Sequence, residues 1–117
     1  MAEAPAIVAG EVANQSATAR GIQSEGRVLQ SIGETKNTAR VSSREGNSVP
    51  DFQNRSAIGE IKDTARLSNT RQLRIQRDAA QASGREHLIY TGRNTRVSET
   101  ASGGSTVKRR DDLGPRQ

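Results

Sequence analysis

Residues 49–62 have the sequence VPDFQNRSAIGEIK, which predicts two neighbouring strands joined by a turn. Pro50 forces an extended or turn-like approach to Asp51, and the next five residues are enough to reverse the chain. Side chains alternate between the two faces of a strand, so Glu60 and Lys62 lie on the same face. We therefore expect Asp51 and Glu60 on neighbouring strands, able to meet at one cation.

The composition predicts one small domain with a thin core. Val, Ile, Leu and Phe together make up 20 of the 117 residues, a share low enough for disorder to be a concern. Charges of both signs are mixed along the chain, so we expect an ordered domain with frayed ends. The net charge of +5 favours nucleic acid or an acidic protein as the partner.

The residue types restrict the chemistry to oxygen ligands. The chain has no cysteine and only one histidine, His87, which excludes thiolate zinc sites and multi-histidine sites. The early apolar run at residues 4–9 is too short to span a bilayer, so we expect no membrane span. Residues 1–19 are predicted to be a leader or linker, flexible or helical, and residues 20–117 the functional domain.

Helix and strand patterns divide the domain. Residues 21–32 predict a helix that presents Ile22, Leu29 and Ile32 to the core and ends at Gly33. Glu25 falls on the same stripe, where a carboxylate is either paired or coordinated, or lies at the helix edge in water. We expect strands at residues 39–41, 48–53 and 56–63.

A second helix is predicted to open at Asn69, with Gln72 three residues later as a capping box, and to run to about Ser83 before Gly84. The buried strand at residues 87–90 is expected to lie parallel to the strand before this helix. Residues 107–110 predict a last strand or helix turn. The two candidate inner rows of the second helix are Leu73, Gln76, Ala80 and Ile75, Ala79, Ala82.

An internal similarity creates two candidate Glu-x-Lys pairs. Residues 31–42, SIGETKNTARVS, resemble residues 57–68, AIGEIKDTARLS. The first copy follows a helical pattern, so we interpret Lys36 as a cation that suits the carboxyl end of a helix. The second copy has the strand pattern and an upstream Pro-Asp, and we prefer it as the functional pair.

These residues suit the hydrolysis of a phosphodiester. The reaction needs charge neutralisation at the phosphoryl oxygens and an activated water, which Mg²⁺ held by carboxylates supplies. Asp51 and Glu60 are the candidate ligands, and Glu25 would complete the shell from the helix. Lys62 could orient the water or stabilise the developing charge.

The spacing of Pro50-Asp51 and Glu60-Ile61-Lys62 resembles the PD-(D/E)xK nucleases of restriction-endonuclease-like fold. More narrowly, residues 20–117 resemble the C-terminal toxin domains of bacterial contact-dependent inhibition and Rhs systems. The segments that carry this narrower resemblance are SEGRVL at 24–29, VPD at 49–51, GEIKD at 59–63, TRQLR at 70–74 and RRDDLGP at 109–115.

The resemblance implies a small α/β core, with a mixed central sheet of about four strands flanked by helices. It implies Mg²⁺ or Mn²⁺ as cofactor, cleavage of transfer RNA or of DNA, and an acidic cognate immunity protein as partner. Such domains are delivered to the cell surface or secreted as part of a larger toxin, and they act in the cytoplasm of the target cell.

Site roles follow from the same resemblance. Glu25 corresponds to the helix carboxylate, Asp51 and Glu60 to the metal ligands, and Lys62 to the catalytic lysine. Gln72 stands where some relatives carry a glutamine that borders the site, although the capping box accounts for it equally well.

Substrate phosphate contacts are assigned to Arg71 and Arg74, at the start of the second helix. Only Phe52 and Tyr90 are aromatic, so we expect recognition of a folded or duplex backbone instead of stacked single strands. Transfer RNA is favoured and DNA is the alternative. A non-catalytic nucleic-acid-binding module and an interaction domain for an acidic protein are the alternatives from other classes.

Overall fold

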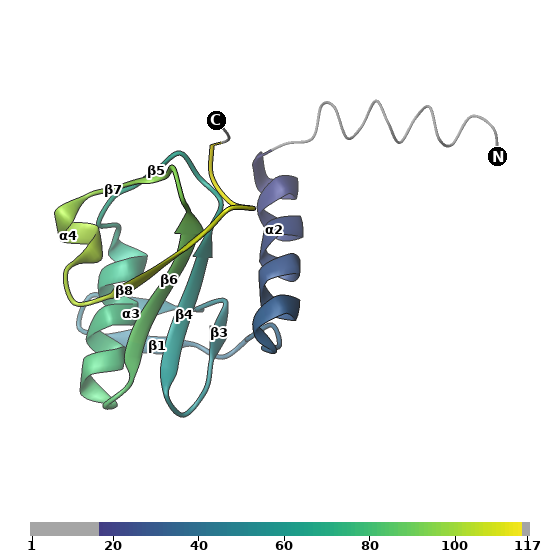
Figure 1. Cartoon of the computed structure of the whole chain (residues 1–117). Helices are drawn as coiled ribbons and strands as arrows, with labels where there is room; N and C mark the ends of the chain where they lie inside the picture. The colour runs from purple at the N-terminus through teal and green to yellow at the C-terminus, as the bar shows by residue number, and fades with distance from the viewer. Residues whose placement is uncertain (1–16, 116–117) are drawn as a thin grey trace, which may run out of the picture.

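A mixed four-stranded sheet forms the centre of the computed structural model, which describes residues 17–115 (Figure 1). The strand order is β3-β4-β6-β8; β3 is antiparallel to β4, and β6 and β8 continue in parallel. The predicted small α/β core with a mixed sheet of about four strands is confirmed. The strands are β3 (Phe52–Gln53), β4 (Ala57–Lys62), β6 (Glu86–Gly92) and β8 (Thr106–Arg110).

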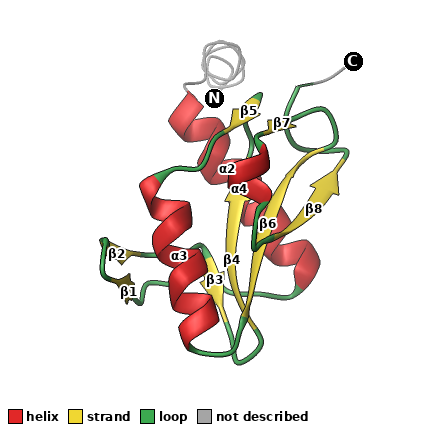
Figure 2. Cartoon of the chain, turned by 90° about the vertical axis from the view of Figure 1, so that its left-hand side faces the viewer, coloured by secondary structure: helices red, strands yellow, loops and turns green. Residues whose placement is uncertain are grey.

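The two long helices cover opposite faces of this sheet, α2 (Ala17–Ile32) on one and α3 (Arg71–Ala82) on the other (Figure 2). The short helix α4 (Glu99–Ser102) lies beside α3. Strand β4 contributes side chains to the core on both faces of the sheet, because Ile58 packs under α3 and Ile61 packs under α2. The period-two alternation of β4 therefore divides the core as the sequence predicts.

Within residues 17–115, three clusters of buried hydrophobic residues form the core. One of them joins Leu73 of α3 to Ile89 of β6 and to Leu67. Under α2 lie Val28, Leu29, Phe52, Ile61 and Leu113. Under α3 lie Val41, Ile58, Ile75, Ala79 and Ala80.

Two small ribbons complete the fold. Strands β1 (Val41–Ser43) and β2 (Gly46–Ser48) form an antiparallel hairpin that packs on α3. Strands β5 (Arg66–Leu67) and β7 (Arg96–Val97) pair in parallel near the carboxyl ends of β4 and β6. No helix in residues 17–115 has the length and apolar character needed to cross a membrane.

Several predicted boundaries are wrong for local reasons. Residues 48–53 are not one strand, because Pro50 lacks the N–H of a ladder bond and separates β2 from β3. The predicted strand at 39–41 is displaced to β1. Ile22 is 66 % exposed instead of buried, because α2 turns Ser24 and Val28 toward the body of the protein.

The second helix is capped one residue later than predicted. Thr70, not Asn69, is the N-cap, and its Oγ1 accepts a hydrogen bond from the Leu73 N–H at 3.3 Å. Gln72 therefore does not form the expected capping box. The predicted stop is confirmed, since Gly84 follows the C-cap with φ of +69°. The buried parallel strand after the helix is also confirmed as β6, and residues 107–110 belong to a strand.

The leader predicted at residues 1–19 lies largely outside the described residues. Of that segment the structure describes only residues 17–19, which belong to α2.

Candidate active site

Asp51 and Glu60 face each other across the first two strands of the sheet. Phe52 pairs with Gly59 in the antiparallel register, and Asp51 directly precedes Phe52 just as Glu60 directly follows Gly59. The Ile61 N–H donates to Asp51 Oδ2 at 2.8 Å. Only 8 % of Asp51 and 6 % of Glu60 is exposed. Two carboxylates are thus held together in a largely dry environment.

The Glu60 carboxylate is bound on both oxygens. Gln76 Nε2 donates to Oε1 at 3.0 Å, and Lys62 Nζ lies 3.3 Å from Oε2. Burial raises the pKa of Glu60, and the charge of Asp51 raises it further, whereas Lys62 and Gln76 act in the opposite direction. Lys62 is therefore the nearby cation that compensates a pair of adjacent carboxylates, on the strand face predicted from the alternation.

A buried hydrogen-bond chain orients Gln76. Its Nε2 donates to Ser48 Oγ and Glu60 Oε1, both at 3.0 Å, which leaves Oε1 to accept from His87 Nε2 at 3.0 Å. His87 Nδ1 then accepts from Ser105 Oγ at 2.7 Å. Because Gln76 Oε1 can only accept, Nε2 of His87 carries a proton, and the neutral imidazole in this tautomer satisfies every member of the chain.

The environment favours that neutral form. Burial, followed by the nearby charge of Arg77, lowers the pKa of His87 to about 4. His87 therefore serves as a fixed hydrogen-bond donor at neutral pH. Because its proton goes to Gln76 and not to the carboxylates, we assign it the role of positioning Gln76.

The glutamine that reaches the candidate site is Gln76, not Gln72. Gln72 is exposed on α3, one turn before Gln76. The sequence placed Gln76 in an inner row of the helix but gave it no polar task. A buried glutamine within a row of Leu and Ala was the signal that could have found it, since a buried amide needs partners.

Helix α2 contributes Glu25 through a second lysine. Lys36 Nζ forms an ion pair with Glu25 Oε2 and lies 3.3 Å from Asp51 Oδ1. Partial burial by itself lowers the pKa of Lys36, but bonding to Glu25 and Asp51 outweighs it and raises the pKa above its ordinary value. Lys36 links the helix carboxylate to the carboxylate of the sheet.

The sequence interpretation of Lys36 as a residue that merely suits a helix end is wrong. The helix does end as predicted, with Gly33 at φ of +74°. Lys36 lies three residues beyond that end, where its ammonium turns back to the site. The repeated Glu-x-Lys pattern was the signal, because both copies supply a lysine to the same group of carboxylates.

Arg71 and Arg74, predicted to contact substrate phosphate, are engaged within the protein. Arg71 Nε donates to the Glu45 carbonyl at 3.0 Å, and Arg74 Nε donates to Glu45 Oε2 at 3.0 Å. The hydrogen bond from Arg74 lowers the pKa of Glu45. Both arginines thereby hold the β1–β2 hairpin against α3, and a phosphate would have to compete with Glu45 for them.

The donor atoms of the site are carboxylate oxygens, the type that hard divalent cations prefer. Asp51 and Glu60 offer carboxylate oxygens side by side, and Glu25 is a third carboxylate that Lys36 connects to Asp51. Within residues 17–115 no three His, Cys, Asp or Glu side chains stand close enough together to hold a metal ion. Oxygen ligands of this type suit Mg²⁺ or Mn²⁺ better than zinc.

The chain matches the model of a known protein family. A family model described as restriction endonuclease fold toxin 7 matches residues 21–101, from α2 into α4. The matched segment contains Glu25, Lys36, Asp51, Glu60 and Lys62. A search of curated proteins and a search of solved structures each find no match to the chain.

Proposed function

The chain belongs to this family of restriction endonuclease fold toxins, and from that premise we propose that it is a metal-dependent nuclease that cleaves transfer RNA in target bacteria. The observation that carries the proposal is the buried pair Asp51 and Glu60 with Lys62 at the end of β4. A family of restriction endonuclease fold implies phosphodiester cleavage, and nucleases of this fold typically use divalent metals.

We assign the chemistry to the residues as follows. Asp51 and Glu60 would hold Mg²⁺ or Mn²⁺. Glu25 is paired with Lys36, so it would join them as a third ligand only if the cation displaced that lysine. A bound divalent cation supplies charge neutralisation at the phosphoryl oxygens and a more acidic water. The Lys62 ammonium, on the face of β4 that carries Glu60, orients the attacking water and stabilises charge that develops on the phosphoryl oxygens. Gln76 fixes the orientation of the Glu60 carboxylate.

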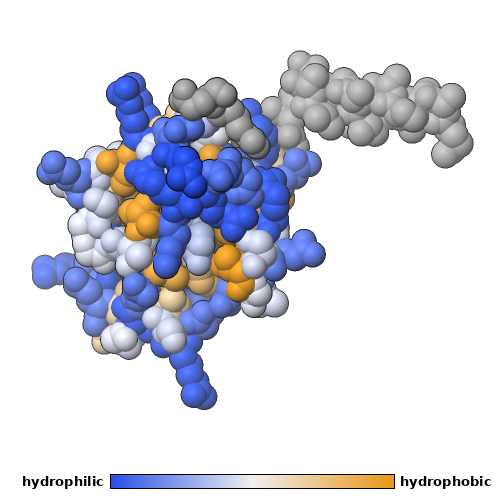
Figure 3. All heavy atoms as spheres, in the orientation of Figure 1, coloured by the Kyte–Doolittle hydropathy of each residue, from blue (hydrophilic) through white to orange (hydrophobic). Residues whose placement is uncertain are grey.

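The shortage of exposed aromatic residues supports a structured substrate. Phe52 is buried in the core and Tyr90 packs against the same cluster, with ring centroids 6.0 Å apart. The face shown in Figure 3 is predominantly hydrophilic, with small separate hydrophobic patches. Neither observation provides a platform for stacked bases, so we favour a folded RNA backbone, with duplex DNA as the alternative.

The family also motivates proposals for the biological setting. We infer that the domain is delivered as part of a larger toxin and acts in the cytoplasm of a competing cell. The net charge of +5 supports an acidic immunity protein as its inhibitor in the producing cell. Inhibition that is lost as salt concentration rises would support this partner, and inhibition indifferent to salt would argue against it.

A cleavage assay tests the enzymatic proposal. The purified chain is incubated with total RNA and with plasmid DNA, in Mg²⁺, in Mn²⁺ and in EDTA. We expect metal-dependent loss of the transfer RNA bands, abolished by Asp51→Ala and by Lys62→Ala. Lys108→Ala, on an exposed position of β8, is the control that removes the same charge.

The outcomes separate the candidate functions. Cleavage of plasmid alone would favour a deoxyribonuclease. Nucleic-acid binding without cleavage, unaffected by Glu60→Gln, would indicate a non-catalytic module. If neither substrate is cut, or if Asp51→Ala and Lys62→Ala cut normally, the nuclease proposal fails.

A further inference from the structure

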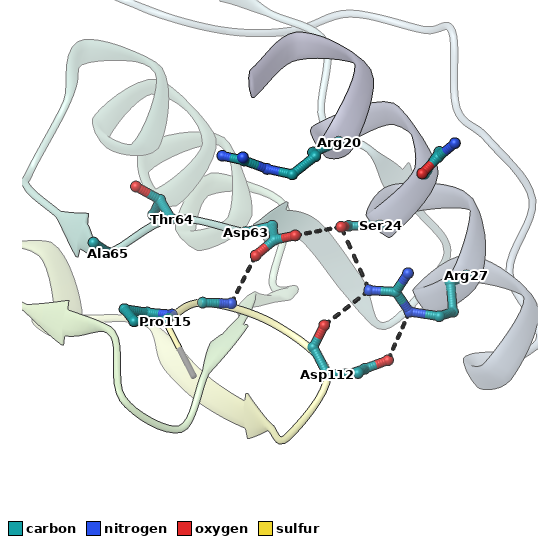
Figure 4. Close-up of a pocket in the computed structure, with 10 residues that line it drawn as sticks. Arg20, Ser24, Arg27, Asp63, Thr64, Ala65, Asp112 and Pro115 are labelled. Carbon is teal, nitrogen blue, oxygen red and sulfur yellow. Dashed lines mark hydrogen bonds and ion pairs between the residues drawn. The ribbon is translucent and has the colours of Figure 1, made fainter. Parts of the chain in front are cut away.

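A pocket of about 500 Å³ lies between α2, the chain after β4 and the C-terminal segment at residues 112–115 (Figure 4). This volume is within the range of roughly 300–1,000 Å³ that small-molecule sites occupy. None of the residues assigned above to metal binding or catalysis lines it. The pocket is therefore a separate feature of the molecule.

The walls of the pocket are fixed by polar contacts inside the protein. Ser24 Oγ donates to Asp63 Oδ2, and the Gly114 N–H donates to Asp63 Oδ1 at 2.7 Å. Arg27 binds Asp112 through Nε to Oδ2 at 2.9 Å and through Nη2 to the carbonyl at 2.8 Å. These bonds join three segments that are far apart in the sequence, so the pocket is part of the folded structure.

Gly114 shows how closely the C-terminal wall is packed. It has φ of +74°, and a Cβ at this position would lie 2.4 Å from Thr95 Oγ1. Glycine is thus required both by the left-handed backbone and by the contact. The C-terminal segment at Gly114 cannot move away from α2 without breaking the hydrogen bond between Gly114 and Asp63.

Arg20 is the cation of the pocket that remains available. It extends from α2 above Asp63 toward Thr64 (Figure 4). Arg27 is committed to Asp112, whereas Arg20 forms no hydrogen bond or ion pair with another residue in the described range. An arginine with free donors in a pocket with fixed walls suits a phosphate group.

Residues of the pocket are direct neighbours in the sequence of two residues of the candidate active site. Ser24 precedes Glu25 in α2, and Asp63 follows Lys62 at the end of β4. Arg20 lies five residues before Glu25, about 7.5 Å along the helix axis at about 1.5 Å per residue.

We propose that the pocket is a substrate subsite of the nuclease, in which Arg20 binds a backbone phosphate of the nucleic acid away from the bond that is cut. This inference relies on the proposed function for the identity of the ligand. It adds a substrate contact outside the carboxylate and lysine site.

Titration of the full chain with adenosine 5′-monophosphate tests the pocket without any cleavage. The readout is the ¹H–¹⁵N NMR spectrum. We expect concentration-dependent shifts at the amides of Arg20, Thr64 and Ala65, and their loss in Arg20→Gln. Shifts confined to other parts of the chain, or no saturable shifts, would overturn the subsite.

Salt dependence tests whether the same contact serves a polymer. Binding of labelled single-stranded RNA and of duplex DNA is measured in EDTA at several salt concentrations. Loss of one phosphate contact reduces the slope of log K against log salt by about 0.7 for a single strand and about 0.9 for duplex. We expect this reduction for Arg20→Gln.

Arg55→Gln is the matched control, since it removes the same charge at the opposite end of β4. Arg55 is exposed in the turn between β3 and β4 and has no ion pair with another residue of the described part. Equal slopes for the two variants would overturn the subsite even if the chain cuts nucleic acid. Absence of cleavage by the wild-type chain would refute the proposed function, while the mononucleotide titration still reports on the pocket.

Discussion

Lys36 links a carboxylate of helix α2 to a carboxylate beside strand β3. Its ammonium contacts Glu25 of α2 and Asp51 beside β3, so it neutralises carboxylates that the fold brings close together. In Lys36→Met, Asp51 keeps the Ile61 N–H as a partner but loses its cation. We expect a loss of about 1 kcal/mol in the free energy of unfolding, because a largely buried charge is left less well compensated.

Urea unfolding at neutral pH measures this loss. Lys108→Met is the control, since Lys108 is exposed on β8 and forms no ion pair within residues 17–115. Equal midpoints for the two variants would show that the Lys36 ammonium does not stabilise the carboxylates.

The lowered pKa of His87 predicts that the folded protein loses stability as the pH falls. Its pKa is about 4 in the folded chain and about 6.5 when exposed, so below pH 6.5 the unfolded chain binds a proton that the folded chain does not. The unfolded state is then favoured, and stability falls as the pH decreases from 6.5 to 4, by about 3 kcal/mol in total. His87→Gln removes this contribution.

The measurement is the free energy of unfolding of both proteins at several values between pH 7 and pH 4. Glu60 is present in both, so its raised pKa largely cancels in the difference. We expect the advantage of the wild type over His87→Gln to shrink steadily as the pH is lowered. Parallel curves would contradict the assignment of a neutral, buried His87.

Strand β4 depends on a glycine for its contact with β3. A Cβ at Gly59 would lie 2.0 Å from Phe52 Cε1, so the ring occupies the space that a side chain would need. Gly59→Ala must push Phe52 aside and with it the neighbouring Asp51. We expect a loss of about 1–3 kcal/mol in unfolding free energy from overpacking, together with reduced nuclease activity.

Gly26→Ala is the contrasting variant. A Cβ at Gly26, in the middle of α2, meets no atom within 4 Å. The same substitution is expected to stabilise the protein there by about 0.5–1 kcal/mol, because alanine is the better helix former. If Gly59→Ala left the urea midpoint unchanged or raised it, as Gly26→Ala is expected to do, the packing argument for Gly59 would be wrong.

At the scale of helices and strands, the sequence predicts those parts of the site that depend on one element alone. The alternation in β4 placed Glu60 and Lys62 on one face, and this depends only on the strand period. The inner position of Gln76 follows from the helix period, but its role does not, because that role depends on partners from three other elements. Lys36 was misinterpreted for the same reason, since its contacts come from a helix turn before it and a strand after it.

At the scale of the whole molecule, the candidate site is assembled from both sides of the sheet. Gln76 of α3 reaches Glu60 from one side, and Glu25 of α2 is linked to Asp51 through Lys36 from the other. The position of Glu25 therefore depends on how α2 docks. That docking relies on the cluster that Leu29 forms with Phe52 and Ile61.

Leu29→Ala should therefore affect activity as well as stability. Leu29 is buried four residues after Glu25, on the same stripe of α2. Truncation is expected to cost about 2–3 kcal/mol in unfolding free energy, because the cavity closes only partly. At a temperature where the variant remains folded, we expect cleavage to fall further than the folded fraction predicts, since Glu25 moves with the loosened helix.

Ile22→Ala on the same helix is the control, because Ile22 is 66 % exposed and its truncation is expected to change stability by less than about 0.5 kcal/mol. Urea unfolding and initial cleavage rates are measured for both variants under one set of conditions. If Leu29→Ala loses activity only in proportion to its unfolded fraction, the seating of α2 does not set the geometry of the site. Glu25 would then be a partner of Lys36 alone, and the carboxylates of the sheet would form the site without the helix.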